Sequence, residues 1–399
     1  MYLIHFKSRD LSRLHSQGQF WHIFMTTGDV IISQNEKDTW TVHRAIPLDA
    51  DISKIGPREA VYAALAGENQ PQPYHIDIDE VLVTSTWRPN ICVAARYTSD
   101  KQRVFLAGDS AHQNIPTGGY GMNTAVGDSF DIGWKLAAAV HGHGGSHLLG
   151  SYERERRPVA VRNIERSGVH WGVHSRYKEW CAEQPGVVTE KSDRGDALRK
   201  KIKEWFNAND GENRDMGIEM GYRYSSSTVV IPPGPNDPSE EPPYLERDYV
   251  ATTWPGSRVP HVFLQDGITS THDVLGKGPE FTLVDFTADG SYIADLGHVA
   301  EDLKIPFKTV HLPREDHVRR IWERDAVLVR PDDHVAWRAS LSGEPPDMRE
   351  ILLIAVGRKT VNRTEDSAES LESHKPKAFS STIGNVNMDD VKLRAEFQL

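Results

Sequence analysis

Short apolar or aromatic runs separated by polar turns dominate roughly the first hundred residues. They are Leu3 to Phe6, Phe20 to Phe24, Val30 to Ile32, Trp40 to Val42 and Val81 to Val83. Short runs bounded by turn residues are typical of strands. Because the first run begins almost at Met1, we expect the sheet to lack a partner strand on one side.

The next hundred residues predict a strand, a loop and two helices. The apolar run from Arg103 to Asp109 predicts a strand buried on both faces of an α/β sheet. After a loop, apolar residues recur at steps of three and four, which predicts a helix from Gly121 to Val140 with one buried face. The residues of that face are Met122, Ala125, Val126, Phe130, Gly133, Leu136, Ala137 and Val140. A charged helix is expected over residues 151–166, and Pro158 should kink it or divide it in two.

Residues 207–255 are rich in Pro, Gly, Ser and acidic residues, which predicts a connecting arm without regular structure. Helical and strand patterns alternate beyond it. The expected elements are strand 281–286, helix 293–303, strand 307–312, helix 315–324, and strands 326–330 and 334–338. This βαβαββ order predicts a small α/β domain, with Pro331 to Asp333 turning its last hairpin. The polar tail that follows is expected to be mobile.

Composition narrows the classes of protein that fit. A chain of 399 residues with 38% hydrophobic content can form two or three folded domains, and its net charge of −11 argues against nucleic-acid binding. No apolar run is long enough for a membrane span, and no secretory signal opens the chain, so a cytoplasmic location is expected. Cys92 and Cys181 are far apart, which predicts two buried thiols and no metal site.

The residues that follow the predicted strand at 103–109 carry the strongest chemical signal. Gly108 permits a tight turn, from which Asp109 projects as an acceptor for a polyol hydroxyl. Gly118, Gly119 and Gly121 let the backbone approach a flat ligand and leave amide groups free at the start of the helix. Such a helix start attracts negative charge, which a reduced flavin develops on its pyrimidine edge. The alternative is that the glycines only form a turn.

The longer pattern resembles a known family. Residues 108–112 and 116–123, with Trp134 to Ala137 and Ser151 to Pro158, resemble the second FAD motif and following helices of class A flavoprotein monooxygenases. These are the FAD-dependent aromatic hydroxylases of the para-hydroxybenzoate hydroxylase and phenol hydroxylase family. Residues 34–40 and 87–97 look like the substrate-domain strands of that family. Residues 255–261 and 327–338 look like its thioredoxin-like third domain.

The resemblance implies an α/β and α+β multidomain fold. Its expected regions are partial substrate-domain strands at 1–97, the carboxyl-terminal part of the FAD-binding domain at 98–206, a linker arm at 207–255, a thioredoxin-like domain at 256–345 and a polar tail at 346–399. It also implies that Asp109 binds the ribityl chain and that Pro116 lies beside the isoalloxazine ring. Gly118, Gly119, Gly121, Met122 and Asn123 are expected to complete the FAD site, the last three through the pyrimidine edge. No catalytic residue is assigned.

The activity implied by the resemblance is hydroxylation of a phenolic or aromatic polyketide-type substrate in secondary metabolism. FAD is the expected cofactor, NADPH the reductant, and an aromatic small molecule the partner. A homodimer is expected by likeness to dimeric relatives.

The chain departs from the family pattern in two respects. The G-x-G-x-x-G motif that holds the ADP half of FAD, and a later Asp-Gly motif, are absent from residues 1–399, and the glycines at 142–145 follow a helix instead of a strand. We therefore expect an N-terminally truncated chain that binds FAD weakly or not at all. The thioredoxin-like region has no cysteine pair, so it is expected to be structural and to form a subunit contact. The alternatives are an inert remnant that acts as a binding or assembly module, and one half of a split enzyme.

Three further sets of residues each allow two interpretations. His112 either relays a proton or fixes the loop by hydrogen bonding. Tryptophans 21, 40 and 87 either fill the core, which is favoured, or line an aromatic pocket. Arginines 154, 156 and 157 either form a solvated helix face, which is favoured, or bind a cofactor phosphate.

Overall fold

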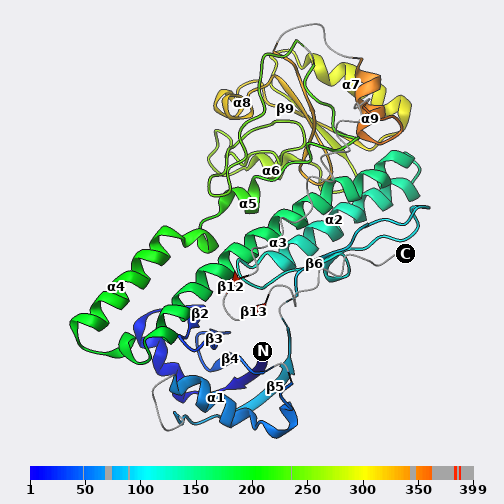
Figure 1. Cartoon of the computed structure of the whole chain (residues 1–399). Coiled ribbons are helices and arrows are strands. Elements are labelled where there is room, and N and C mark those ends of the chain that lie inside the picture. Colours follow the sequence, from blue (N-terminus) through cyan, green and yellow to red (C-terminus); the bar gives the residue numbers. More distant parts are fainter. Residues whose placement is uncertain are drawn as a thin grey trace. The chain divides into compact units, whose positions relative to one another are not determined.

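The computed structural model describes residues 1–47, 49–67, 74–88, 90–234, 236–341, 347–361, 382–383 and 386–387 (Figure 1). They fall into two compact units, which we describe separately. Unit 1 contains Met1–Asn90, Val169–Asp210 and the described residues near 385. Unit 2 contains Ile91–Gly168 and the described residues from Gly211 to 361.

Unit 1 is built on an antiparallel five-stranded sheet in the order β2-β3-β4-β1-β5. Its strands are β1 (Tyr2–Lys7), β2 (His22–Phe24), β3 (Val30–Ser33), β4 (Thr39–Arg44) and β5 (Glu80–Thr86). All five strands expected from the apolar runs are confirmed. The expectation that the opening strand lacks a partner is wrong, because β1 pairs with β4 on one side and with β5 on the other. Alternating burial along β1 shows that one face of the sheet forms the core.

Unit 1 also contains shorter helices and part of the long helix α3, which is described below. The shorter helices are η1 (Asp10–Gln17), η2 (Ile52–Lys54), α1 (Pro57–Ala66), η4 (Val187–Thr189) and α4 (Asp193–Ala208). Helix α1 packs Val61 and Ala64 into the core beside Trp40 and Ile4. Trp40 is therefore a core residue as expected, whereas Trp21 is 70% exposed, which contradicts the core interpretation for that residue.

Helix α3 (Ser146–Glu183) contributes residues 146–168 to unit 2 and residues 169–183 to unit 1. Pro158 lies inside it, so the helix is not divided in two. The described residues include no helix with the length and apolar character of a membrane span.

In unit 2, the prediction of a strand over residues 103–109 is wrong. The chain there is extended, but Phe105 forms only an isolated bridge to Thr98, and residues 108–110 form the short helix η3 (Gly108–Ser110). Val104 is 51% exposed, so the run is not buried on both faces. A buried strand needs hydrogen-bonded neighbours on both sides, and the described part of the chain supplies one bridge. Nearby, β6 (Cys92–Val93) pairs with β7 (His112–Gln113).

The helix predicted over residues 121–140 is confirmed as α2 (Tyr120–Val140), but its buried face is not the predicted one. The buried residues are Tyr120, Thr124, Asp128, Asp131, Ile132, Lys135 and Ala138. Met122, Val126 and Phe130 of the predicted face are each more than half exposed. The reason is that charged side chains on the buried face pair with residues elsewhere in unit 2, so burial follows ion pairs instead of apolar character.

The predicted connecting arm is partly helical and largely packed. It contains η5 (Asp210–Asn213) and α5 (Met216–Met220). Tyr224, Val229 and Val230 are buried, and the amide of Ile231 donates a hydrogen bond of 2.9 Å to the carbonyl oxygen of Ala336. Buried apolar residues therefore hold this Pro-rich segment in place, although most of it lacks regular secondary structure.

The alternating pattern near the carboxyl end is confirmed. A short helix α6 (Thr271–Val274) precedes β8 (Phe281–Asp285), α7 (Ser291–Leu303), β9 (Phe307–His311), α8 (Asp316–Trp322), β10 (Ala326–Val329) and β11 (Val335–Arg338). The sheet order is β11-β10-β8-β9, with β8 and β9 parallel and the other pairs antiparallel. Asp333 has a φ of 62°, which suits the tight turn between β10 and β11.

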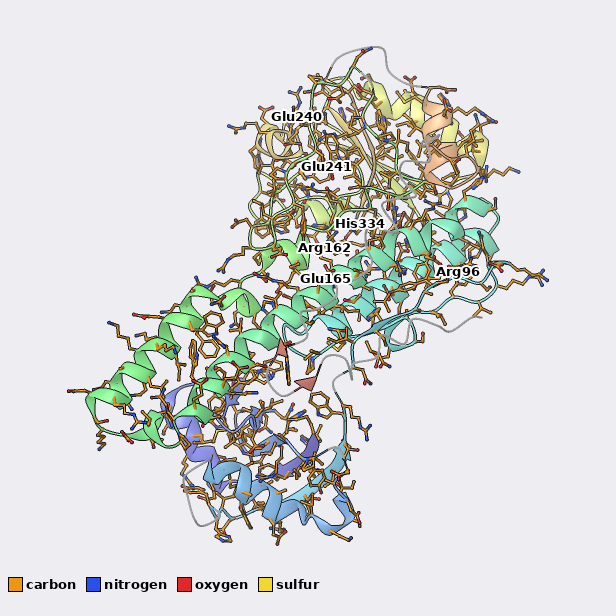
Figure 2. The ribbon with its side chains drawn as sticks, in the orientation of Figure 1. Arg96, Arg162, Glu165, Glu240, Glu241 and His334 are labelled. Carbon is orange, nitrogen blue, oxygen red and sulfur yellow. The ribbon has the colours of Figure 1, made fainter. Side chains whose placement is uncertain are left out.

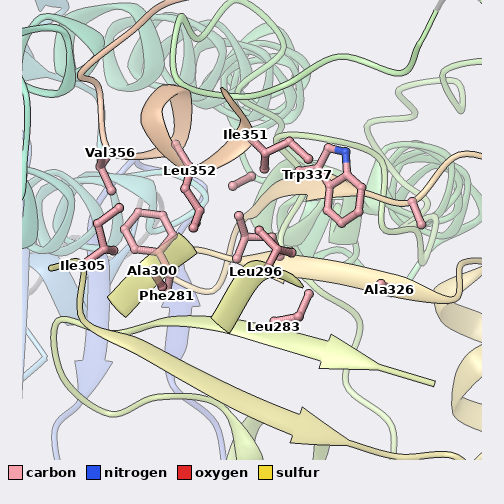
Figure 3. Packing of buried hydrophobic residues seen from close by; sticks show 14 residues of the cluster. Phe281, Leu283, Leu296, Ala300, Ile305, Ala326, Trp337, Ile351, Leu352 and Val356 are labelled. Atoms are coloured by element: carbon pink, nitrogen blue, oxygen red, sulfur yellow. The ribbon is translucent and has the colours of Figure 1, made fainter. Parts of the chain in front are cut away.

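Helix α9 (Met348–Ala355) lies where a polar tail was expected from residue 346. Its residues Ile351, Leu352 and Ala355 are buried in one apolar cluster with residues of the β8 sheet. Figure 3 shows Ile351 and Leu352 near Leu296 of α7 and Trp337 of β11. Two short paired strands follow, β12 (Thr382–Ile383) and β13 (Val386–Asn387). The remainder of the expected tail lies outside the described residues.

Candidate functional site

Gly108 begins the segment that carries the predicted site. Its φ of 57° lies in the left-handed region, and a Cβ added there would come within 3.0 Å of the Cβ of Ala125. Its amide donates a hydrogen bond of 3.2 Å to Oδ2 of Asp128 in α2. Glycine is therefore required both by the turn and by the close approach to the helix. The next side chain, Asp109, is exposed, and its carboxylate accepts no hydrogen bond from any described residue.

His112 fixes the loop to α2. Its ring is buried, and Nε2 lies 3.1 Å from Oδ2 of Asp128. Arg156 of α3 donates from Nε to the other oxygen of Asp128 over 2.8 Å. Burial raises the pKa of the Asp128 carboxyl, but the hydrogen bond from His112 and the charge of Arg156 outweigh burial and hold this pKa below its ordinary value. The contact between His112 and Asp128 agrees with the interpretation that His112 fixes the loop by hydrogen bonding. The role of His112 as a proton relay stays a prediction.

Arg156 is only 1% exposed, so the solvated-face interpretation is wrong for this residue. Its guanidinium also donates to the carbonyl oxygen of Thr124 and to the hydroxyl of Tyr224. These three acceptors bind α3 to α2 and to the Pro-rich segment. They occupy the guanidinium, so Arg156 is not available to a cofactor phosphate.

The loop before α2 is anchored at three points. Asn114 and Thr117 both bond to Ser167 of α3, at 3.1 Å to its hydroxyl and 2.7 Å to its carbonyl oxygen. The amide of Gly118 donates to Oε1 of Glu212 over 3.0 Å. Pro116 lies between these anchors and is exposed. Other residues of unit 2 therefore hold the loop by hydrogen bonds, while Pro116 remains exposed to solvent.

The amino-terminal end of α2 is open. Gly118 and Gly119 have φ values of 83° and 68°, and Gly119 is an N-cap residue without a side-chain cap. The first amides of a helix have no acceptor within the helix, so the backbone of Gly121 and Met122 presents donors at this end. Asn123 donates from its side chain to the carbonyl oxygen of Gly119 over 2.9 Å.

All seven predicted FAD residues thus belong to one segment between η3 and the first turn of α2. Five of them are exposed: Asp109, Pro116, Gly119, Met122 and Asn123. A free carboxylate suits a polyol, and an uncapped helix end with glycine-bearing backbone suits the negative edge of a flat ligand. This chemistry fits the ribityl chain and isoalloxazine ring of a flavin.

Comparisons with known proteins agree with this chemistry. Residues 1–167 match the model of an FAD binding domain, and residues 252–358 match that of the aromatic-ring hydroxylase carboxyl-terminal domain. The FAD-dependent monooxygenase opdD of Penicillium oxalicum is 40% identical over 371 residues, which are 89% of this chain and 68% of that protein. The chain belongs to the FAD-dependent monooxygenases.

Other members of the monooxygenase family show how much of a relative's length this chain covers. The FAD-dependent monooxygenase apdD of Emericella nidulans is 41% identical over 367 residues, or 89% of this chain and 58% of that protein. The crystal structure of the flavin-dependent monooxygenase PieE with FAD and substrate superposes with a TM-score of 0.73 at 29% identity, covering 89% of this chain and 65% of that one. The chain therefore spans about three fifths of the length of these relatives.

A second cluster in this monooxygenase chain was not predicted from the sequence. Asp131 and Lys135 of α2, Glu155 of α3, and Arg330 and Asp332 after β10 are all buried. Lys135 donates to Asp131 over 2.7 Å and to Glu155 over 2.6 Å. Arg330 donates two hydrogen bonds of 2.8 Å to Glu155 and two, of 2.6 and 3.0 Å, to Asp332. We call these five residues the buried charge cluster.

The carboxyls of the cluster have different pKa values. Burial, assisted by the negative charge of Glu155, raises the pKa of Asp131 from 3.8 to about 7. Burial also disfavours ionised Glu155, but the charges of Arg330 and Lys135 outweigh burial and lower its pKa from 4.5 to about 2. Carboxylate oxygens of Asp131, Glu155 and Asp332 lie within 4.8 Å of one another, yet the two cations already occupy them. The cluster is therefore an ion-pair network and not a metal site.

Aromatic rings lie beside Arg330 of the buried charge cluster. The guanidinium carbon of Arg330 lies 5.2 Å from the ring centre of Trp134 and 5.1 Å from that of Tyr224. His334, labelled in Figure 2, stacks on Tyr224 with ring centres 4.3 Å apart. The only sequence signal for the cluster is the spacing of Asp131 and Lys135, four residues apart on one helix.

Proposed function

We propose that this chain takes part in FAD- and NAD(P)H-dependent hydroxylation of a phenolic or aromatic polyketide-type substrate. The observation that carries the proposal is the segment from Asp109 to Asn123, which combines a free carboxylate with an open helix end. Named relatives support the substrate class. They include a phenol 2-monooxygenase of a Pseudomonas species at 32% identity and a putative polyketide hydroxylase of Streptomyces halstedii at 31%.

In this proposal each part of the segment has a separate task. Asp109 accepts hydrogen bonds from the ribityl hydroxyls, because its carboxylate has no competing donor among the described residues. The backbone of Gly121, Met122 and Asn123 faces the pyrimidine edge, where the helix end stabilises negative charge. Pro116 provides an apolar contact for the ring and has no amide hydrogen that would bind water there.

Bound FAD would supply the redox chemistry, taking electrons from NAD(P)H and activating oxygen toward an electron-rich ring. The contribution of the chain is to bind and orient. His112, Asp128 and Arg156 hold the loop against α2, and Thr117 holds it against α3. Rigid support of this kind keeps the ligand-binding groups in position without reorganisation.

The proposal is tested by incubating the chain with FAD, NADPH, oxygen and a panel of phenols and aromatic polyketides. The expected result is NADPH consumption stimulated by substrate, with a product heavier by one oxygen atom in the mass spectrum. With FAD in saturating excess, absence of such a product with every panel member would overturn the substrate class.

We also propose that residues 256–345 form a thioredoxin-like domain without thiol chemistry that contributes a subunit contact. The sheet order β11-β10-β8-β9 and the helices between its strands support the fold. Both cysteines, Cys92 and Cys181, lie outside this range, so disulfide exchange has no reactive group there. Light scattering of the full chain should give the mass of a dimer, and a monomer would contradict the contact.

A further inference from the structure

Unit 1 contains a cavity of about 410 Å³ between β2, the end of α3, η4 and α4. Pockets for small molecules usually have volumes of roughly 300 to 1,000 Å³. We infer that this cavity binds a planar aromatic molecule carrying one acidic group. The inference concerns unit 1 alone and depends on neither flavin binding nor hydroxylation.

Aromatic side chains form the walls of the cavity. Tyr177 of α3 and Phe206 of α4 lie with ring centres 5.2 Å apart at 46°. Phe24 of β2 is 38% exposed, although it is a large apolar residue, and its ring centre lies 4.2 Å from that of His174. Rings set at different angles around an open space offer both faces and edges to a flat aromatic ligand.

Aliphatic side chains complete the apolar lining, with Val188 of η4 and Ile202 of α4 beside the rings. No acidic side chain lines the cavity as described. A ligand here would therefore bury its apolar surface against apolar groups and meet no negative charge. This lining favours an aromatic ligand over a sugar, most of whose hydroxyls would be left without partners.

Arg199 and Lys203 bring two positive charges to the cavity, but only one is available. Arg199 donates to the carbonyl oxygens of Val188 and Glu190 over 2.7 and 2.8 Å, and it also pairs with Asp196. Its guanidinium therefore holds η4 against α4. Lys203 is exposed and forms no ion pair with any described residue. A single free ammonium beside an apolar cavity suits one carboxylate or phenolate.

The experiment is a calorimetric titration of the full chain, without FAD, with naphthoate and with its neutral amide. Naphthoate should bind more tightly than naphthamide. In Lys203→Met the affinity for naphthoate should fall about tenfold, because a charge-assisted contact is lost, while the affinity for naphthamide stays the same. Lys200→Met is the matched control on the same helix, since Lys200 is paired with Glu204 and does not line the cavity.

A second variant locates the binding. Thr26→Phe places a ring in the cavity and should abolish binding of both probes, with an unchanged circular dichroism spectrum as the folding check. Three results would overturn the inference: no binding of naphthoate up to its solubility limit, equal naphthoate affinity in Lys203→Met and the unaltered chain, or full binding by Thr26→Phe.

Discussion

Asp131 and Glu155 lie in the same buried cluster but have opposite pKa shifts. Both compete for the same two cations, Lys135 and Arg330. Glu155 receives short hydrogen bonds from both cations, whereas Asp131 lies 3.3 Å from Arg330. The raised pKa of Asp131, caused mainly by burial, makes it the carboxyl of the cluster that binds a proton most readily.

This difference predicts how stability depends on pH. The folded pKa of Asp131, about 7, lies above its ordinary value of 3.8. Its contribution to stability is therefore complete below pH 3.8 and is lost as pH rises toward 7, because the unfolded chain releases the proton first. Glu155 has the opposite sign, and its contribution is lost only as pH falls through 4.5 toward 2.

The measurement is the unfolding midpoint of the unaltered chain and of Asp131→Asn between pH 4.5 and 7, where, of the two carboxyls, only Asp131 changes its contribution. The difference between the two midpoints should shift steadily in favour of Asp131→Asn as pH rises. Asp325→Asn, at the surface, provides the control. A difference that does not change with pH would contradict the raised pKa.

At the scale of elements, helix α2 shows what the sequence could and could not predict. Steps of three and four residues located the helix correctly, because they depend only on helical geometry. They did not locate its buried face, because Asp128, Asp131 and Lys135 are buried by partners on distant segments. Helix α9 was not predicted, because its short apolar run adjoins a long polar tail.

Two glycines of the α2 region differ in the space around them, and substitutions at them should have opposite effects on stability. Gly118 has a φ of 83°, and a Cβ added there would overlap the ring of Tyr120. Gly118→Ala should therefore cost about 1 to 3 kcal/mol of unfolding free energy and should also weaken flavin binding. Gly133, inside the same helix, has open space around it, so Gly133→Ala should stabilise by about 0.5 to 1 kcal/mol. Urea unfolding of both variants checks this, and equal effects would contradict the account.

At the scale of the whole molecule, contacts within unit 2 join segments that are far apart in sequence. The buried charge cluster connects α2, α3 and the β10–β11 turn. The seven residues proposed to bind the flavin could be proposed from the sequence alone because all of them lie between 108 and 123. The cluster was not, because no local pattern indicates that Arg330 will meet Glu155, 175 residues away.

Removing one member of the cluster should be costly. Arg330→Met leaves Glu155 and Asp332 buried without their main cation, which should cost about 3 to 5 kcal/mol. Arg319 and Asp325 form an exposed pair, so Arg319→Met should cost less than about 1 kcal/mol. Comparing the two by urea unfolding tests the cluster, and similar losses would show that it contributes no more than a surface pair.

In our proposal, the segment from Asp109 to Asn123 binds the isoalloxazine and ribityl parts of a flavin. Riboflavin contains both parts and lacks the ADP half, so its binding reports on this segment directly. The measurement is quenching of riboflavin fluorescence by the full chain and by Asp109→Ala, with thermal unfolding as the check on folding. We expect saturable quenching by the unaltered chain and an affinity about tenfold lower in Asp109→Ala, from loss of a charged hydrogen-bond acceptor. Absence of quenching, or equal affinity in two equally stable proteins, would contradict the account.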